Sequence, residues 1–238
     1  MARPTILNLG CGTRTSTDTV NIDWSIHLRL HRSMLGRLLA PVWLRGYRRE
    51  AFSGLSGHVV VHDLRKGIPA ETGTVDAVYH SHVLEHIDRE NVPAFLVEVH
   101  RVLKPGGIHR IVVPDFGRAA RNYLDSLERE LTDHDQTLIP LLLQSVMHEA
   151  HGTSLQSPMR RRVENLLLGD ARKRGQTHQW AYDRVNLRQI LEQHGFVEFE
   201  VLEPNESSIP GWAGTGLEMD PDGKIHKPGS MWVECRKG

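Results

Sequence analysis

The sequence has little of what secreted and membrane proteins depend on. Among 238 residues there are only two cysteines, Cys11 and Cys235, too few for a disulfide framework. No apolar run approaches the roughly 20 residues that a membrane-spanning helix needs. The first apolar stretch begins at Thr5, which leaves no room for a signal peptide. We therefore expect a cytoplasmic protein without a transmembrane segment.

An excess of charge of one sign is also missing. Lysine and arginine (29) balance aspartate and glutamate (29), and aromatic residues make up only 6% of the chain. Nucleic-acid binding usually shows a basic surface with interleaved aromatic side chains, so this balance disfavours a nucleic-acid partner. With 39% hydrophobic residues, the chain can bury a core without disulfides. The composition predicts one domain, residues 1–238, with insertions.

Near the amino terminus, an apolar stretch ends in two glycines. The stretch before Gly10 is typical of a buried strand, and Gly10 and Gly12 at its carboxyl end allow the backbone to approach a ligand closely. A second short strand, residues 20–23, ends in Asp23, which is placed to accept hydrogen bonds from a ribose. The pattern indicates a nucleotide-cofactor site at the tips of these strands.

A dinucleotide-binding turn is the main competing interpretation of these glycines. That fingerprint needs a third glycine, where this chain has Thr15, and an acidic residue about 20 positions further on. Here about ten residues separate Gly12 from Asp23, too few for a full crossover helix. We expect the first helix to be missing or vestigial.

The later segments predict an α/β layout of alternating strands and helices. We expect a third strand over residues 59–64, a fourth strand leading into a helix within 74–87, a helix over 92–103 that ends at Pro105-Gly106-Gly107, and a fifth strand over 109–115. A helix over 185–194 and two further strands, 196–202 and 231–236, with a turn at 221–223 between them, complete the pattern.

At this point the chain resembles the class I methyltransferases that use S-adenosylmethionine. Four motifs occur in the family's order: Leu7 to Gly12, Asp63-Leu64, Ser81 to His86, and Leu103 to Gly107. The nearest resemblance is to the subgroup with a shortened first helix. It implies a doubly wound, Rossmann-like, seven-stranded and mostly parallel sheet with an antiparallel final strand and helical cap insertions.

The resemblance also implies where S-adenosylmethionine binds. Gly10 and Gly12 would approach its methionine portion, Asp23 the ribose hydroxyls and Asp63 the adenine amino group, with Leu64 packed on the ring. The full set of implied cofactor-binding residues is Leu9, Gly10, Gly12, Asp23, Trp24, Asp63, Leu64 and His80.

Methylation of a hydroxyl or an ammonium requires a base near neutral pH, and histidine is suited to that role. His82 is the first candidate, because it follows the fourth strand, where the family places groups close to the transferred methyl; a structural hydrogen bond is its alternative role. Asp115, at the end of the fifth strand, could orient a base or bind the acceptor. His148 could reach the site from an insertion. These three residues form the candidate catalytic set.

Two insertions interrupt the core. Residues 24–57 contain six arginines against the single acid Glu50 and resemble a basic amphipathic helix broken near Pro41. They could form a lid on the sheet edge, a peripheral membrane contact or a surface for a polyanionic substrate. Residues 116–179 contain further apolar and arginine-rich stretches, and the resemblance implies an acceptor-binding cap over the active site.

The 15 histidines raise the question of a metal. His82 to His86 matches the His-x-x-Glu-His metalloprotease pattern, and His148 and His151 add two imidazoles at helical spacing. The four-motif context argues against a metallohydrolase, and Glu85 is then expected to hold the start of a helix. We assign no metal, although a methyltransferase assisted by a divalent cation stays an alternative.

The sequence thus predicts an enzyme that methylates a small polar molecule: a metabolite, a sugar or a natural-product intermediate. Two alternatives stay open, a non-catalytic membrane- or polyanion-docking module on the same fold and a nucleic-acid methyltransferase.

Overall fold

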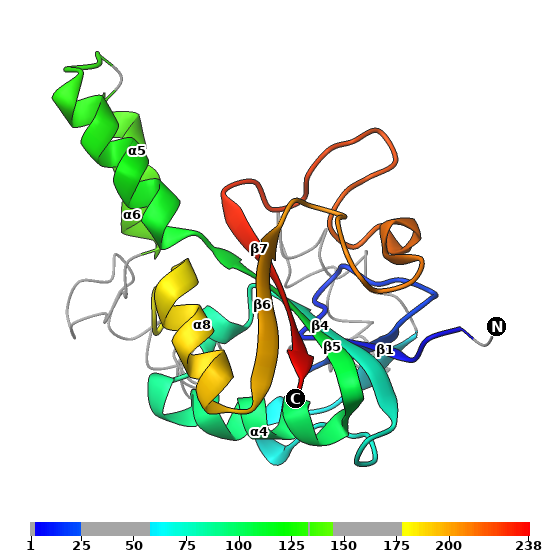
Figure 1. Cartoon of the computed structure of the whole chain (residues 1–238). Helices are drawn as coiled ribbons and strands as arrows, with labels where there is room; N and C mark the ends of the chain where they lie inside the picture. Colours follow the sequence, from blue (N-terminus) through cyan, green and yellow to red (C-terminus); the bar gives the residue numbers. More distant parts are fainter. Residues whose placement is uncertain (1–2, 25–57, 133, 145–177) are drawn as a thin grey trace, which may run out of the picture.

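A computed structural model describes residues 3–24, 58–132, 134–144 and 178–238 of the chain. A seven-stranded sheet with the order β3-β2-β1-β4-β5-β7-β6 forms its centre (Figure 1). The strands are β1 (Ile6–Leu9), β2 (Val20–Asp23), β3 (Val59–Val61), β4 (Val75–Ser81), β5 (Leu103–Pro114), β6 (Phe196–Leu202) and β7 (Ser230–Lys237). Strands β1 to β5 pair in parallel, and β7 runs antiparallel to β5 and β6, which confirms the predicted doubly wound, Rossmann-like sheet.

One face of the sheet is covered by two helices, α4 (Val92–Val102) and α8 (Arg184–Gln193) (Figure 1). The apolar stripe of α4 is buried against this face through Val92, Phe95, Leu96 and Val99. Helix α8 begins with a capping box, in which the Asp183 carboxylate accepts from the backbone N–H groups of the first turn. Burial of both helices against the sheet forms the main core.

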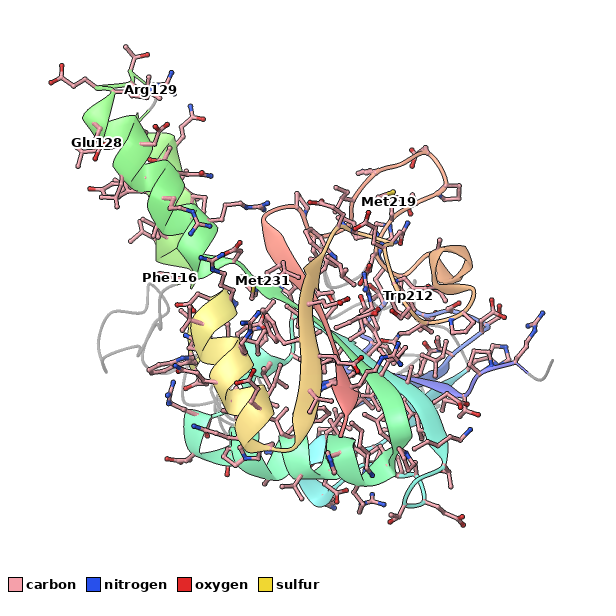
Figure 2. All side chains as sticks on the ribbon, viewed as in Figure 1. Phe116, Glu128, Arg129, Trp212, Met219 and Met231 are labelled. Carbon is pink, nitrogen blue, oxygen red and sulfur yellow. The ribbon has the colours of Figure 1, made fainter. Side chains whose placement is uncertain are left out.

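The other face is covered by the segment between β6 and β7, which includes the short helix η4 (Trp212–Thr215). Figure 2 shows Trp212 in this helix, and its side chain is only 2% exposed. Under it lies Arg110 of β5, fully buried, which donates to the Glu218 carboxylate at 2.8 and 2.6 Å and to Glu234 at 2.8 Å. This buried ion-pair cluster attaches the segment to the sheet.

Helices α5 (Phe116–Glu128) and α6 (His134–Gln144) form a hairpin that projects away from the sheet (Figure 1). In Figure 2, Phe116 lies where the hairpin leaves the sheet, while Glu128 and Arg129 lie at its far end. The hairpin is the described part of the 116–179 insertion, together with residues 178 and 179. Among the described ranges, no helix has the length and apolar content needed to cross a membrane.

The structure differs from some of the expected element boundaries. The third strand ends at Val61 and not at residue 64, because Asp63 caps a 3₁₀ turn over Leu64–Lys66. Residues 11–19 contain turns and no helix, which confirms the expectation that the first helix is missing or vestigial. The helix expected directly after β4 is wrong, because two short 3₁₀ turns, η2 (Leu84–His86) and η3 (Arg89–Asn91), precede α4. The fifth strand starts at Leu103, earlier than expected, because the chain becomes extended at the end of α4 and passes through Gly106 (φ 70°).

Candidate active site

The carboxyl ends of β1 to β5 and the amino end of the antiparallel β7 lie at one edge of the sheet. The parallel strands lead there into Gly10, Asp23, His82 and Asp115, and β7 begins there with Ser230. In open α/β sheets ligands bind at this edge, near the point where the strand order reverses. Here the order reverses between β1 and β4.

The turn after β1 has the backbone shape that the two glycines predict. Gly10 and Gly12 have φ values of 63° and 53°, in the left-handed region that favours glycine. A Cβ atom at Gly10 would lie 2.5 Å from Cγ2 of Val83, so this turn packs directly against the segment after β4. A Cβ at Gly12 would meet no described atom within 4 Å. Among the described residues, the space beside Gly12 is open.

Asp23 is joined to this turn. The residue is 8% exposed, and its carboxylate accepts a hydrogen bond from the Gly12 backbone N–H at 2.8 Å. Trp24 follows it with a 39% exposed side chain. The negative charge also acts on the buried thiol of Cys11, whose pKa is raised to about 12, first by burial and then by Asp23. The Cys11 thiol is therefore protonated at neutral pH.

Two buried asparagines hold the loop that connects β1 to β2 where the first helix is missing. They were not identified from the sequence. Asn8 Nδ2 donates to the Arg14 carbonyl at 2.9 Å and to Asn21 Oδ1 at 3.0 Å. Asn21 in turn donates to the Ser16 carbonyl at 2.9 Å and accepts from the Thr19 hydroxyl at 2.9 Å. These bonds satisfy a loop that has no helical ladder of its own. The asparagine at the centre of each strand is the signal that was available.

Asp63 and Leu64 follow β3, as the resemblance requires. The Asp63 carboxylate is engaged by Arg65 through Nε and Nη2, both at 2.8 Å, and it caps the short helix η1 (Leu64–Lys66). This hydrogen bonding with Arg65 lowers the pKa of Asp63, although burial opposes the shift. A charged carboxylate with remaining acceptor lone pairs is compatible with an adenine amino group.

His80 needs a correction. It lies within β4, opposite Leu9 of β1, and its imidazole is fully buried on the α4 face, 3.0 Å from that of His109. Burial lowers the pKa of His80 to about 4, with the charge of Glu85 acting weakly in the opposite direction. The His80 side chain is therefore a neutral part of the core, and only its backbone could contact a ligand at the strand tip.

His82 occupies the position between β4 and η2 with a left-handed backbone (φ 54°), which is unusual for a residue other than glycine. Its Nε2 lies 2.9 Å from Oγ of Ser230, and its Nδ1 lies 3.1 Å from Oε1 of Glu85. Backbone strain of this kind often occurs at functional sites. Sequence reasoning missed Ser230, which lies 148 residues away in the chain.

Glu85 is 1% exposed and still carries its charge. Burial raises the pKa of its carboxyl, but contact with His82 and the charges of His82 and His86 lower it by more, so that the pKa lies below its ordinary value. Burial, with help from the charge of Glu85, raises the pKa of Tyr182. The site thus contains a buried carboxylate behind His82, a residue that the sequence analysis assigned only to a helix start.

Two further imidazoles lie next to this carboxylate. One ligand atom from each of Glu85, His86 and His178 can be chosen so that all three lie within 4.8 Å of one another. His178 reaches this place because the next residue, Gln179, donates its backbone N–H to the Glu85 carbonyl at 2.6 Å. No metal was expected at these residues from the sequence, because their proximity depends on a contact between segments far apart in the chain that no local pattern encodes.

Asp115, the second catalytic candidate, lies at the end of β5. Its Oδ1 accepts from the Arg118 N–H at 2.9 Å, so it caps α5. His148, the third candidate, lies outside the described residues, as do the 25–57 part of the basic insertion and the 145–177 part of the predicted cap.

Comparison with known proteins adds three findings. Residues 7–111 match a family model described as a methyltransferase domain. No curated protein matches the sequence. Solved structures with a similar fold include S-adenosylmethionine-dependent methyltransferases from three organisms. The one from Archaeoglobus fulgidus has 14% identity, covers 99% of this chain and 87% of its own, and has a TM-score of 0.46.

The second, from Methanosarcina mazei, has 15% identity, covers 100% of this chain and 94% of its own, and has a TM-score of 0.45. The third, from Mesorhizobium loti, has 16% identity, covers 99% of this chain and 91% of its own, and has a TM-score of 0.40. At such low identity, the roles of individual residues have to be argued from this chain.

Proposed function

We propose that this chain, whose residues 7–111 are a class I S-adenosylmethionine-dependent methyltransferase domain, transfers a methyl group to a small polar acceptor. S-adenosylmethionine is the cofactor of this domain, and when bound it supplies an electrophilic methyl group on a positively charged sulfur. The chain's own residues bind this cofactor, orient the acceptor and take up the proton that the acceptor loses.

The turn after β1 and Asp23 fit this cofactor. The open space beside Gly12 would admit its methionine portion, and the adjacent Asp23 carboxylate would accept hydrogen bonds from the ribose hydroxyls. Asp63 and Leu64 lie at the next strand end and would receive the adenine. Gly12 and Asp23 are already hydrogen-bonded to each other, so the ribose site is preorganised.

The contacts of His82 with Glu85 on one side and Ser230 on the other are the observation that supports the proposed acceptor chemistry. The partner at Nδ1 determines which imidazole nitrogen holds the proton, and the ionised Glu85 favours the tautomer with the proton on Nδ1. Nε2 then faces Ser230 as an acceptor. An acceptor hydroxyl or ammonium must lose a proton on methylation, and His82 Nε2 can receive it. We therefore propose His82 as the base and Glu85 as its positioning residue.

The acceptor is proposed to be small and polar because the groups at this edge are polar. His82 and Asp115 follow two adjacent strands, and Ser230 begins the third. The contact between Gly10 and Val83 brings the residue after His82 against the cofactor turn, so the proposed base lies next to the proposed donor site. The described part of the 116–179 insertion leaves from Asp115, where a cap could enclose the acceptor.

Binding of S-adenosylhomocysteine to Asp23 variants tests this proposal. Asp23→Ala should weaken binding at least tenfold, because charge-assisted hydrogen bonds contribute roughly 1.5–3 kcal/mol each. Asp18→Ala is the matched control, since it removes a carboxylate whose partner is the exposed Arg3 at 2.7 Å. Calorimetry should show unchanged affinity for the control. Equal affinity of Asp23→Ala and the wild type would remove Asp23 from the ribose site.

Formation of S-adenosylhomocysteine in the presence of candidate acceptors tests the second half of the proposal. Sugars and small amine or hydroxyl metabolites should support turnover. Turnover that requires RNA or DNA and falls steeply with salt would instead identify a nucleic-acid substrate.

A further inference from the structure

We propose that Glu85, His86 and His178 bind a divalent transition-metal ion beside the acceptor position. The ion-binding site is inferred from the arrangement of these three side chains. Its use in holding the acceptor rests on the proposed function. The two parts are therefore tested by separate measurements.

The geometry is close to that of a three-ligand metal site. The ligand atoms of the three residues lie within 4.8 Å of one another. Donors around one zinc ion lie about 2.0–2.2 Å from the metal, which in tetrahedral geometry separates a pair of them by about 3.3–3.6 Å. Small rotations of side chains therefore complete the site. The His86 and His178 rings are already in contact, with centroids 4.8 Å apart and planes inclined at 70°.

The backbone keeps these ligands together. Glu85 and His86 are adjacent in η2, whose backbone is closed by the hydrogen bond from the His86 N–H to the Val83 carbonyl at 3.0 Å. His178 is attached through its neighbour Gln179, which donates to the Glu85 carbonyl at 2.6 Å. Only side-chain rotation is needed to bind an ion, and such preorganisation lowers the entropic cost of binding.

The Glu85 carboxylate gives an independent reason for a cation. It is 1% exposed, and neither oxygen has a well-aligned hydrogen-bond donor among the described residues. His82 Nδ1, at 3.1 Å from Oε1, contacts it at ion-pair distance. A buried carboxylate is costly unless charges or hydrogen bonds compensate it. A divalent ion would supply the compensating charge.

The donor set indicates which ions fit. Two imidazoles with one carboxylate favour zinc, iron, cobalt or manganese over magnesium and calcium, which prefer oxygen donors. Three protein ligands leave coordination positions open, as in catalytic zinc sites. An open position next to His82 could take an acceptor oxygen, which a bound cation would orient and make more acidic.

Zinc titration of the wild type tests the site directly. Protein prepared without a histidine tag is stripped with EDTA, and zinc binding is measured by calorimetry. We expect one ion per chain with a dissociation constant on the order of 1 μM or below. Cobalt should bind in the same place and give visible absorption. Absence of stoichiometric zinc and cobalt binding would overturn the proposal.

Three variants locate the ion. Glu85→Gln and His178→Gln should each weaken zinc binding at least tenfold. His194→Gln should leave it unchanged, because His194 ends α8, where its Nδ1 contacts the Ile190 carbonyl at 2.7 Å. If Glu85→Gln does not fold, the half-buried His178 decides the question. Wild-type zinc affinity in His178→Gln would refute the site.

A parallel titration with S-adenosylhomocysteine separates the two proposals. Wild-type protein that binds S-adenosylhomocysteine but no zinc would refute the metal site and leave the proposed function intact. Protein that binds zinc but not S-adenosylhomocysteine would refute the proposed function alone. In the predicted case both bind, and His178→Gln loses zinc affinity while it keeps affinity for S-adenosylhomocysteine.

Discussion

Replacing each of the two glycines after β1 by alanine should separate stability from cofactor binding. Both have positive φ, so alanine at either position costs about 1–2 kcal/mol of stability. At Gly10 the new Cβ would also lie 2.5 Å from Val83 Cγ2, and overpacking adds about 1–3 kcal/mol. At Gly12 no described atom lies within 4 Å. Gly10→Ala should therefore be the more destabilised variant, by about 1–3 kcal/mol.

Cofactor affinity should rank the two variants in the opposite order to stability. The Gly12 Cβ would enter the space proposed for the ligand, so Gly12→Ala should lose at least tenfold in affinity for S-adenosylhomocysteine although it is the better-folded variant. Urea unfolding followed by circular dichroism gives the stabilities, and calorimetry gives the affinities. In a Val83→Ala background, Gly10→Ala should cost less than in the wild type. Wild-type affinity in Gly12→Ala, or equal destabilisation of both variants, would refute the reasoning.

Three further results are expected. Arg110→Met should lower the free energy of unfolding in urea by about 3–5 kcal/mol, since it leaves two buried carboxylates without their partner; a loss below about 1 kcal/mol would contradict the role of the cluster. Burial lowers the pKa of His80 from 6.5 to about 4. As the pH falls, the unfolded chain therefore takes up a proton before the folded protein does. The free energy of unfolding should then decrease between about pH 6.5 and pH 4 and stay constant above about pH 6.5. A free energy of unfolding that is constant from about pH 7.5 to 5 would argue against a buried neutral imidazole. His82→Gln should reduce the methylation rate of an identified acceptor by about 10²–10⁴-fold, and a wild-type rate would exclude His82 as the base.

Short-range patterns predicted most of the fold. The apolar strands, the glycines after β1 and the Pro221–Gly223 turn were each identified from neighbouring residues, and the structure contains all of them, although β3 is shorter than expected and β5 begins earlier. Strands β6 and β7 were also predicted from their alternating patterns, whereas their antiparallel pairing was implied by the family resemblance. These features depend on backbone preferences and on periodicity, which are local properties.

The boundary errors have a physical reason as well. Pro105 and the glycines after it were expected to end a helix, and a helix does end before them, at Val102. The same residues are also compatible with extended backbone, however, and β5 includes them. A helix-ending pattern excludes helix without specifying the conformation of the next segment, so the start of β5 was misplaced.

The side-chain arrangement of the site was accessible only through tertiary structure. Side chains alternate between the two faces of a strand, and His80 lies on the face that is packed against α4. The alternation alone does not identify which face α4 covers. Ser230 joins His82, and His178 joins Glu85, only because distant segments meet at the same sheet edge. The cofactor residues were predictable because they lie in local motifs, whereas the acceptor side is assembled from separate parts of the chain.

The most direct measurement is a crystal structure of the protein with S-adenosylhomocysteine. The account predicts the ribose hydroxyls within hydrogen-bonding distance of the Asp23 carboxylate, with the homocysteine portion against Gly10 and Gly12. A ligand bound elsewhere, or a turn whose open side is filled by protein side chains, would contradict it.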